Sequence, residues 1–307
     1  MEVLDRYFGI SDRGSTLRAE VRGGLATFFT MAYIVVLNPI ILTSAKDVEG
    51  NSLDFAAVTT STALVAAVMT IVMGIVGRYP LALAAGLGLN GVVAFQLAGV
   101  MSWPAAMGVV VIEGILITIL VATGFRTAVF EAIPLALKQA ISVGIGLFIA
   151  FIGFVAAGFG RRSGAGPVPV SLGPENRLVG WPTVVFVLGL LVTSVLVARR
   201  VRGAILIGIL VGTIFAIGLN AIVDVGPQFV PGGDPNPSGW GLNVPKLPSD
   251  VFSAPDFSLL GEFSLGGSFA AVGVISASLF VFTLLLADFF DTMGTIVGVG
   301  AEGDMLD

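Results

Sequence analysis

Apolar runs of about twenty residues recur along almost the whole chain, and they restrict its fold more than any other feature. A helix needs about 20 residues to cross the roughly 30 Å hydrocarbon core of a bilayer. Of the 307 residues, 56% are hydrophobic and 11% are charged, whereas soluble domains average roughly 25% charged residues. The mean hydropathy is +1.00. These values predict an all-α membrane protein with several spans rather than a soluble domain.

Two of the predicted spans are irregular. The third starts at Pro80 and holds three glycines within six residues, and the second half of the eighth, "ADFFDTMGTIVGVG", mixes acids, threonines and glycines. Non-helical backbone survives at membrane depth only where protein or a water-filled cavity surrounds it. An interrupted span therefore points inward, toward a site. The eight predicted spans cover residues 23–45, 55–77, 80–98, 104–123, 134–159, 181–198, 204–222 and 268–300.

The glycines of the third span have the spacing of a dinucleotide-binding fingerprint. In "AAGLGLNGVVAF", residues 84–95, the glycines follow the order G-x-G-x-x-G, and Glu113 lies downstream. That fingerprint needs a strand, a turn and a helix in a soluble sheet. Here both flanks are predicted membrane spans. We therefore interpret the glycines as a break in a span and not as a nucleotide site.

Missing residue types narrow the chemistry. The chain contains no cysteine and no histidine, so thiol nucleophiles, disulfides, histidine metal sites and histidine relays are excluded. A proton handled inside the membrane must then be carried by a carboxylate. The net charge of −5 argues against nucleic acid as a partner. We expect neither an enzyme nor a bound metal or cofactor.

The basic residues predict the orientation. With the N-terminus in the cytoplasm, ten basic residues fall on the inside and five on the outside. Since inside loops are enriched in lysine and arginine, this favours a cytoplasmic N-terminus in the cell membrane. The inside residues are Arg6, Arg13, Arg18, Arg22, Arg78, Arg126, Lys138, Arg199, Arg200 and Arg202, and the outside residues are Lys46, Arg161, Arg162, Arg177 and Lys246.

Three acids lie inside predicted spans: Glu113, Asp288 and Asp291. Each costs about 2.5 to 3.5 kcal/mol near a helix centre, so each needs a partner, a proton or water. The i, i+3 spacing puts Asp288 and Asp291 on one helical face, together with Thr292 and Thr295. This arrangement predicts a helix that lines a cavity, with apolar residues on its other side, namely Phe289, Phe290 and Met293.

Structural roles are the alternatives for these polar residues. Asp288 and Asp291 could cap a broken helix end, and Glu113 could make a structural hydrogen bond inside the bundle. Asn38 could satisfy carbonyls that Pro39 leaves without a donor. For Asn90, which sits in the glycine-rich break, we favour a functional role.

Four stretches together resemble the nucleobase-cation symporter family (xanthine/uracil permease superfamily), in its adenine/hypoxanthine/guanine permease, AzgA-like branch. They are "TLRAEVRGGLATFFTMAYIVVLNPIIL", "AGLGLNGVVAF", "ISVGIGLFIAFIGF" and "FTLLLADFFDTMGTIVGVG". The resemblance covers the whole chain. It implies two inverted repeats of seven spans, with a core domain that holds the substrate and a gate domain against which the core moves.

Under this resemblance, residues 1–124 form core spans one to four and residues 125–223 form gate spans five to seven. Residues 224–267 form an external loop rich in proline and glycine, and residues 268–307 hold core span eight. The chain stops at "AEGDMLD", just past that span. It therefore resembles the N-terminal part of a permease, and a truncated fragment that does not transport is an open alternative.

The resemblance also implies the site residues. In the family a short extended break in the third span presents its backbone to the purine, which matches "GLGLN" at 86–90, although Ala85-Gly86-Leu87-Gly88 stands where the family usually has Pro-Gly-Met-Gly. The implied substrate contacts are Asp288, Asn90, Leu89, Gly88 and Thr292. Apart from the resemblance, desolvation and mutual repulsion of the two acids favour Asp291, or Asp291 together with Asp288, as the proton carrier, and Glu113 and Asn38 are assigned a structural or coupling role.

The predicted function is proton-coupled uptake of purine nucleobases: adenine, hypoxanthine or guanine. Purine edges alternate N–H donors with ring-nitrogen acceptors, and a carboxylate accepts one or two N–H groups. Xanthine or uracil as substrate and sodium as coupling ion remain open. An intramembrane aspartyl protease is disfavoured because it needs its two acids on different helices. The expected partners are a purine and the lipid bilayer, and a homodimer is possible.

Overall fold

The computed structural model describes residues 2–132, 134–162, 170–173, 177–201, 203–228, 236–241, 244–247 and 254–302. The chain divides into two compact units. One comprises Met1–Ile145 together with Ala254–Asp307, and the other comprises Gly146–Ser253. The boundary falls inside helix α8 (Leu135–Ala156).

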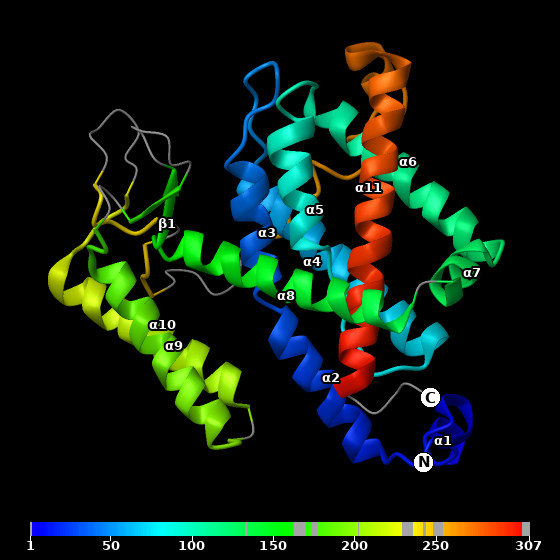
Figure 1. The fold of residues 1–307 in the computed structure, drawn as a ribbon, viewed down its shortest axis with the longest axis horizontal. Coiled ribbons are helices and arrows are strands. Elements are labelled where there is room, and N and C mark those ends of the chain that lie inside the picture. The colour runs from blue at the N-terminus through cyan, green and yellow to red at the C-terminus, as the bar shows by residue number, and fades with distance from the viewer. Residues whose placement is uncertain are drawn as a thin grey trace. The chain divides into compact units, whose positions relative to one another are not determined.

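The first half of the first unit consists of helices, and a longer loop over residues 44–54 separates the third from the fourth (Figure 1). The helices are α1 (Glu2–Phe8), α2 (Leu17–Met31), α3 (Ile34–Thr43) and α4 (Phe55–Val72), and α4 continues as the π-helix η1 (Met73–Gly77). Polar caps fix where two of them begin. Thr16 Oγ1 accepts from the Ala19 N–H at 3.2 Å before α2, and Asp54 Oδ1 accepts from the Ala57 N–H at 2.9 Å before α4.

The predicted first span is therefore two helices, α2 and α3, and it begins at Leu17 rather than at residue 23. The third span begins with a non-helical segment that follows Arg78, a residue in the left-handed conformation, and extends to Gly86; it becomes helical in α5 (Leu87–Val92) and the π-helix η2 (Val93–Leu97). The next two helices are α6 (Trp103–Ala122) and α7 (Phe125–Ala132).

The eighth span is α11 (Gly267–Glu302), which packs along α6 (Figure 1). It is interrupted at Gly273, whose φ of 80° and ψ of 164° are not helical. This conformation lies outside the regions that residues with a side chain adopt readily. The irregularity thus lies in the first half of the span. The acidic second half, for which the sequence predicted a disturbance, is regular helix.

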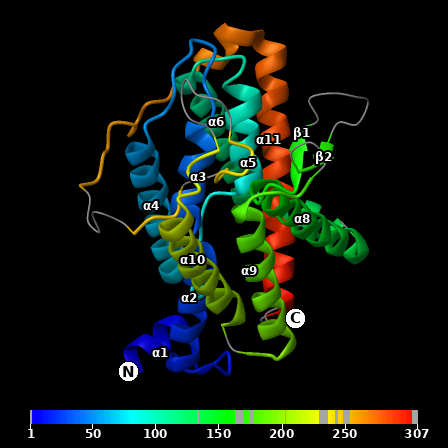
Figure 2. The same ribbon diagram turned by 90° about the vertical axis from the view of Figure 1, so that its left-hand side faces the viewer.

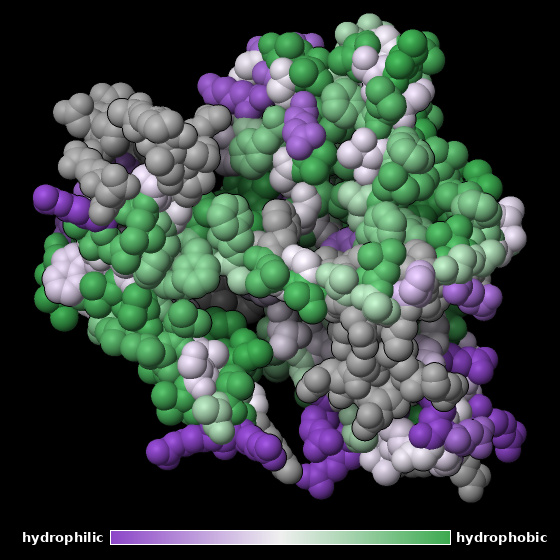
Figure 3. All heavy atoms as spheres, in the orientation of Figure 1, coloured by the Kyte–Doolittle hydropathy of each residue, from purple (hydrophilic) through white to green (hydrophobic). Residues whose placement is uncertain are grey.

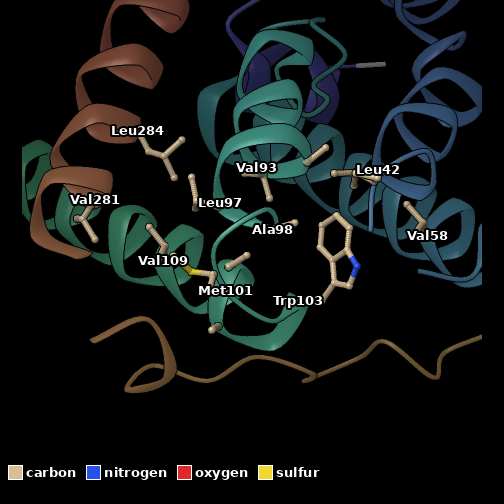
Figure 4. Close-up of a cluster of buried hydrophobic side chains, with 14 residues drawn as sticks. Leu42, Val58, Val93, Leu97, Ala98, Met101, Trp103, Val109, Val281 and Leu284 are labelled. Atoms are coloured by element: carbon tan, nitrogen blue, oxygen red, sulfur yellow. The ribbon is translucent and has the colours of Figure 1, made fainter. Parts of the chain in front are cut away.

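A buried apolar cluster joins the helices of the first unit (Figure 4). Leu97 and Met101 lie at its centre and are fully buried. Between membrane helices such contacts stabilise mainly by close van der Waals packing, since lipid is as apolar as the side chains. The cluster fixes the third span against its neighbours, and its labelled members from those neighbours are Leu42, Val58, Trp103, Val109, Val281 and Leu284.

One ionised side chain organises the turn before α4. Asp47 accepts hydrogen bonds from the N–H groups of Asn51 at 2.8 Å and Glu49 at 3.0 Å, and from the N–H of Trp103 at 3.2 Å. Burial raises the pKa of Asp47, but these hydrogen bonds to the charged form outweigh burial and hold the pKa below its usual value. The carboxylate therefore connects this turn to the start of α6.

The second unit contains the rest of α8, two short strands and a helical hairpin. Strands β1 (Gly160–Arg162) and β2 (Val170–Leu172) pair antiparallel, which the sequence did not predict. Helices α9 (Trp181–Ala198) and α10 (Ala204–Val223) lie side by side (Figure 2). Small residues let them approach, since a Cβ on Gly189 would lie 3.9 Å from the Cα of Gly212.

The segment after α10 folds back onto that helix. Trp240 donates its indole N–H to Oδ1 of Asn220 at 2.8 Å. Pro227 and Trp240 form an isolated bridge. Within the described parts of residues 224–247, this bridge is the only pairing of strand type.

Six helical stretches of the described chain, one of them formed by α2 and α3 together, are long and apolar enough to cross a membrane. Apolar residues cover the sides of the long helices, whereas hydrophilic residues gather near α1 and at the α9–α10 connection (Figure 3). The prediction of a multi-pass, mostly helical membrane protein is confirmed. The six helical stretches are Leu17–Thr43, Phe55–Gly77, Trp103–Ala122, Trp181–Ala198, Ala204–Val223 and Gly267–Thr295.

Candidate functional site

Extended backbone crosses the first unit before α5, and two threonines bond to it. The N–H of Ala82 donates to Thr27 Oγ1 at 3.1 Å, and the N–H of Leu83 donates to Thr70 Oγ1 at 2.9 Å. Thr27 lies on α2 and Thr70 on α4. Backbone groups at membrane depth need such partners because lipid offers none. Hydroxyl groups of two neighbouring helices therefore stabilise the break.

The break ends at Gly86, and this corrects its predicted position. Gly86 is still extended, with φ −71° and ψ 123°, but helix α5 begins at Leu87. The sequence predicted the break at residues 86–90, whereas those after Gly86 lie in the first turn of α5. The prediction was wrong because a glycine in a first helical turn, such as Gly88, is compatible with a helix, while Pro80 upstream cannot donate to one.

The first turn of α5 leaves backbone donors open. The first helical hydrogen bond runs from the N–H of Asn90 to the carbonyl of Gly86 at 3.3 Å. The N–H groups of Leu87, Gly88 and Leu89 precede it and have no partner within the helix. The predicted contact residues Gly88 and Leu89 thus lie where backbone donors are available to a ligand.

The carboxylate of Asp291 lies against this helix start. A Cβ built on Gly86 would be 2.8 Å from Asp291 Oδ2, so a larger residue there would require the carboxylate or the helix start to shift. The N-terminal end of a helix carries partial positive charge, which favours a carboxylate. The structure therefore brings the third and eighth spans together at one polar position.

Glu113 of α6 lies near Asp288 and Asp291 of α11. Asp288 lies close enough to both Asp291 and Glu113 for the carboxyl groups to interact. Glu113 is 8% exposed, and its Oε1 has no hydrogen-bond partner among the described residues. From the sequence, Glu113 was predicted to stand alone, because α6 and α11 are far apart along the chain. Their packing makes it the third member of a carboxylate cluster formed with Asp288 and Asp291.

Asn90 contributes a buried donor. Its Nδ2 atom has no hydrogen-bond partner among the described residues. Thr292 is half-buried, whereas Thr295 and Phe290 are exposed. The buried apolar side of α11 near the acids therefore consists of Phe289 and Met293 rather than of all three predicted residues.

Asn38 makes a structural contact. Its Nδ2 donates to Thr62 Oγ1 at 2.8 Å, and the Thr62 hydroxyl donates to the carbonyl of Val58 at 2.7 Å. The partner of Asn38 is thus a side chain of α4, and this hydrogen bond does not go to a carbonyl that Pro39 leaves without a donor. This hydrogen bond connects α3 to α4.

The sequence did not single out Thr27 and Thr70. The signal for Thr27 was present in "GGLAT", residues 23–27, where two glycines precede a threonine on one helical face. No comparable pattern marks Thr70. Its role appears only in the folded unit, where α4 lies beside the extended segment.

Comparison with known proteins gives the family. Residues 18–302 match the family described as "Permease family" (Xan_ur_permease). The guanine/hypoxanthine permease PbuG of Bacillus subtilis is 33% identical over 99% of this chain and 64% of its own length. The adenine permease AdeP of Escherichia coli is 32% identical over 99% of this chain and 61% of its own length. The chain thus spans less than two thirds of either relative, and by its family match it belongs to this permease family.

Proposed function

We propose that this chain forms part of a permease that takes up a purine nucleobase together with a proton. Relatives named as guanine/hypoxanthine and adenine permeases support a purine as the substrate. The observation that carries the proposal is the contact between Asp291 and Gly86 at the start of α5. It places the acidic face of α11, which also carries Asp288, beside open backbone donors, and a purine edge requires both donors and an acceptor.

The polar groups divide into donors and acceptors that suit a purine. The N–H groups of Leu87, Gly88 and Leu89 and the Nδ2 of Asn90 supply donors for ring nitrogens or a carbonyl oxygen. Asp288 supplies the acceptor for a purine N–H. Such a bond to a charged group is stronger than one between neutral groups. Thr292, one helical turn beyond Asp288, lies on the same side of α11 and completes the proposed contacts.

The carboxylate cluster supplies the proton site. Each charge costs about 2.5 to 3.5 kcal/mol at membrane depth, and like charges repel. A proton bound by Asp291, or shared between Asp291 and Asp288, relieves both costs. Glu113 faces the same repulsion from Asp288 and extends the cluster into α6.

Proton and purine binding are coupled through α5 in this proposal. A charged Asp291 interacts favourably with the helix start, an effect of roughly 0.3 to 1 kcal/mol that reaches about 2 kcal/mol in partly buried sites. Protonation removes that interaction and leaves the first-turn N–H groups to the purine. Binding of one ligand then favours binding of the other, as reciprocal coupling requires.

The proposed orientation places the N-terminus in the cytoplasm. Arg13 donates to the carbonyl of Arg78 at 2.8 Å. Arg78 also lies over the ring of Tyr7, 4.9 Å from its centroid. Basic residues from two segments that were both predicted to lie inside therefore occupy the same end of the first unit, which supports placing that end in the cytoplasm.

The test is uptake by cells that lack purine permeases of their own. They would express the protein that contains this chain and receive radiolabelled adenine, hypoxanthine, guanine, xanthine or uracil. We expect accumulation of a purine base that a protonophore abolishes and that continues without sodium. Uptake of uracil alone would overturn the proposed substrate, and a sodium requirement would overturn the proposed coupling ion.

A further inference from the structure

Two threonines outside the proposed binding surface hold the segment that leads to it. We propose that Thr27 and Thr70 are positioning residues, which fix residues 78–86 so that the start of α5 meets Asp291 and the purine. This inference rests on the proposed function. It assigns a role in substrate affinity to two side chains that do not touch the substrate.

The contact with α2 is close and polar. A Cβ on Gly23 would lie 3.6 Å from Cγ of Pro80, and one on Gly24 would lie 3.9 Å from the carbonyl oxygen of Pro80. Thr27 follows on the same helical face. Its hydroxyl accepts the N–H of Ala82 at 3.1 Å and lies 3.3 Å from the carbonyl oxygen of Pro80. The two glycines thus allow the approach, and Thr27 determines where along α2 the segment sits.

On α4, the Thr70 hydroxyl contacts both backbone polar groups of Leu83, as a residue of a neighbouring β-strand would. The Thr70 hydroxyl accepts the N–H of Leu83 at 2.9 Å and lies 3.3 Å from the carbonyl oxygen of the same residue. In a sheet, a residue of the next strand would satisfy both groups. Ala82 and Leu83 are therefore bonded in succession to two different helices, which fixes both the position and the rotation of the segment.

The candidate site lies a short distance downstream. Gly86 follows Leu83 by three residues, and extended backbone advances about 3.3 Å per residue. Within the part of the chain that the structure describes, the backbone groups of Ala84 and Ala85 have no hydrogen-bond partner. The two threonines are therefore the nearest polar restraints before the contact of Gly86 with Asp291. A shift of the segment at Leu83 is transmitted to the backbone donors of α5.

Transport kinetics test this role. Thr27→Val and Thr70→Val keep the shape of each side chain and remove the hydroxyl. We expect each to raise the KM for purine uptake by about 5- to 20-fold, the size of one lost hydrogen bond, with little change in maximal rate per molecule at the membrane. Thr27→Ser and Thr70→Ser keep the hydroxyl and should restore a KM within about twofold of wild type.

Matched controls lie on the same two helices. The Thr30 hydroxyl bonds only to carbonyls of its own helix, those of Ala26 and Thr27, and the Thr59 hydroxyl bonds to that of Phe55. Thr30→Val and Thr59→Val should leave the KM unchanged. If the variants of Thr27 and Thr70 behave like these controls, or if serine fails to restore the KM, the inference is wrong.

Hydrogen exchange separates this inference from the proposed function. In purified protein, Thr27→Val should speed exchange of the Ala82 amide, and Thr70→Val that of the Leu83 amide, whereas the control variants should not. If wild-type protein takes up no purine, the proposed function is wrong. Hydrogen exchange alone then tests whether Thr27 and Thr70 hold the segment in place. Unchanged exchange at both amides would overturn the positioning role whatever the transport result.

Discussion

Replacing Gly86 with alanine adds one methyl group where the third span meets the eighth. The backbone of Gly86 has φ −71° and ψ 123°, a conformation that alanine adopts without strain. The new Cβ would lie 2.8 Å from Asp291 Oδ2, about 0.6 Å inside the 3.4 Å at which ordinary van der Waals contact begins. The carboxylate therefore has to rotate away, or the start of α5 has to move.

We expect the purine dissociation constant of Gly86→Ala to rise about 5- to 30-fold, because the clash with Asp291 displaces the donors of α5 relative to Asp288 and costs one hydrogen bond to the purine, about 1 to 2 kcal/mol. The assay is equilibrium binding of labelled purine to purified protein. Gly91→Ala is the matched control: it lies on the same helix, and its Cβ would meet no atom within 4 Å. It should leave affinity unchanged and stabilise α5 by about 0.5 to 1 kcal/mol through helix propensity.

The contact with Asp291 supplies a second check on the same reasoning. In an Asp291→Ala background the carboxylate is gone, so Gly86→Ala should cause no additional loss of affinity. Two coupled positions show this kind of non-additivity in a double-mutant cycle. Equal affinities of the two glycine variants, or a full additional loss in the Asp291→Ala background, would refute the steric explanation.

Four other predictions concern single side chains. Asp288→Asn should weaken purine binding by roughly 2 to 4 kcal/mol, about 30- to 1000-fold, and binding as tight as that of wild type would contradict the contact between Asp288 and the purine. Asp291→Asn should impair uphill uptake more than it impairs purine binding. Asn38→Ala should cost about 0.6 to 1.7 kcal/mol of stability, as interhelical hydrogen bonds in membranes do, and adding Thr62→Val should cost little more in thermal unfolding. Because the pKa of Asp47 is lowered, the contribution of its charge to stability is present above about pH 4 and is lost as the pH falls further. The thermal unfolding midpoints of wild type and Asp47→Asn should therefore differ at pH 7 and converge in acid. A difference that stays constant with pH would show that the charge of Asp47 is not responsible.

The sequence was sufficient to predict that the protein is a multi-span membrane protein, because this class depends only on the lengths of apolar runs along the chain. The length of an apolar run is compared with the thickness of a bilayer, and neither quantity depends on tertiary contacts. The family followed from four stretches of sequence, and the match over residues 18–302 confirms it. The irregular third span could also be predicted, since proline and glycine act on their own backbone.

The arrangement of the candidate site depends on contacts between spans. Asp288 and Asp291 share a helical face by their spacing, and this is a local property of one helix. The approach of Glu113 to Asp288 depends on the packing of α6 against α11, and no spacing along the chain reveals it. For the same reason, the sequence left the partner of Asn38 open, and the structure identified it as Thr62 on α4.

The sequence by itself determined that this chain is a permease-family membrane protein with a broken third span and two acids on one face of the eighth, because apolar length, glycine and proline content and helical periodicity are local properties. Only the tertiary structure decided where the break ends, which carboxylate lies on Gly86, and that Thr27 and Thr70 bond to the extended backbone. Those contacts join groups on different helices, 55 residues apart in the case of Thr27 and Ala82. Their partners are selected by the packing of whole helices, which no local pattern encodes.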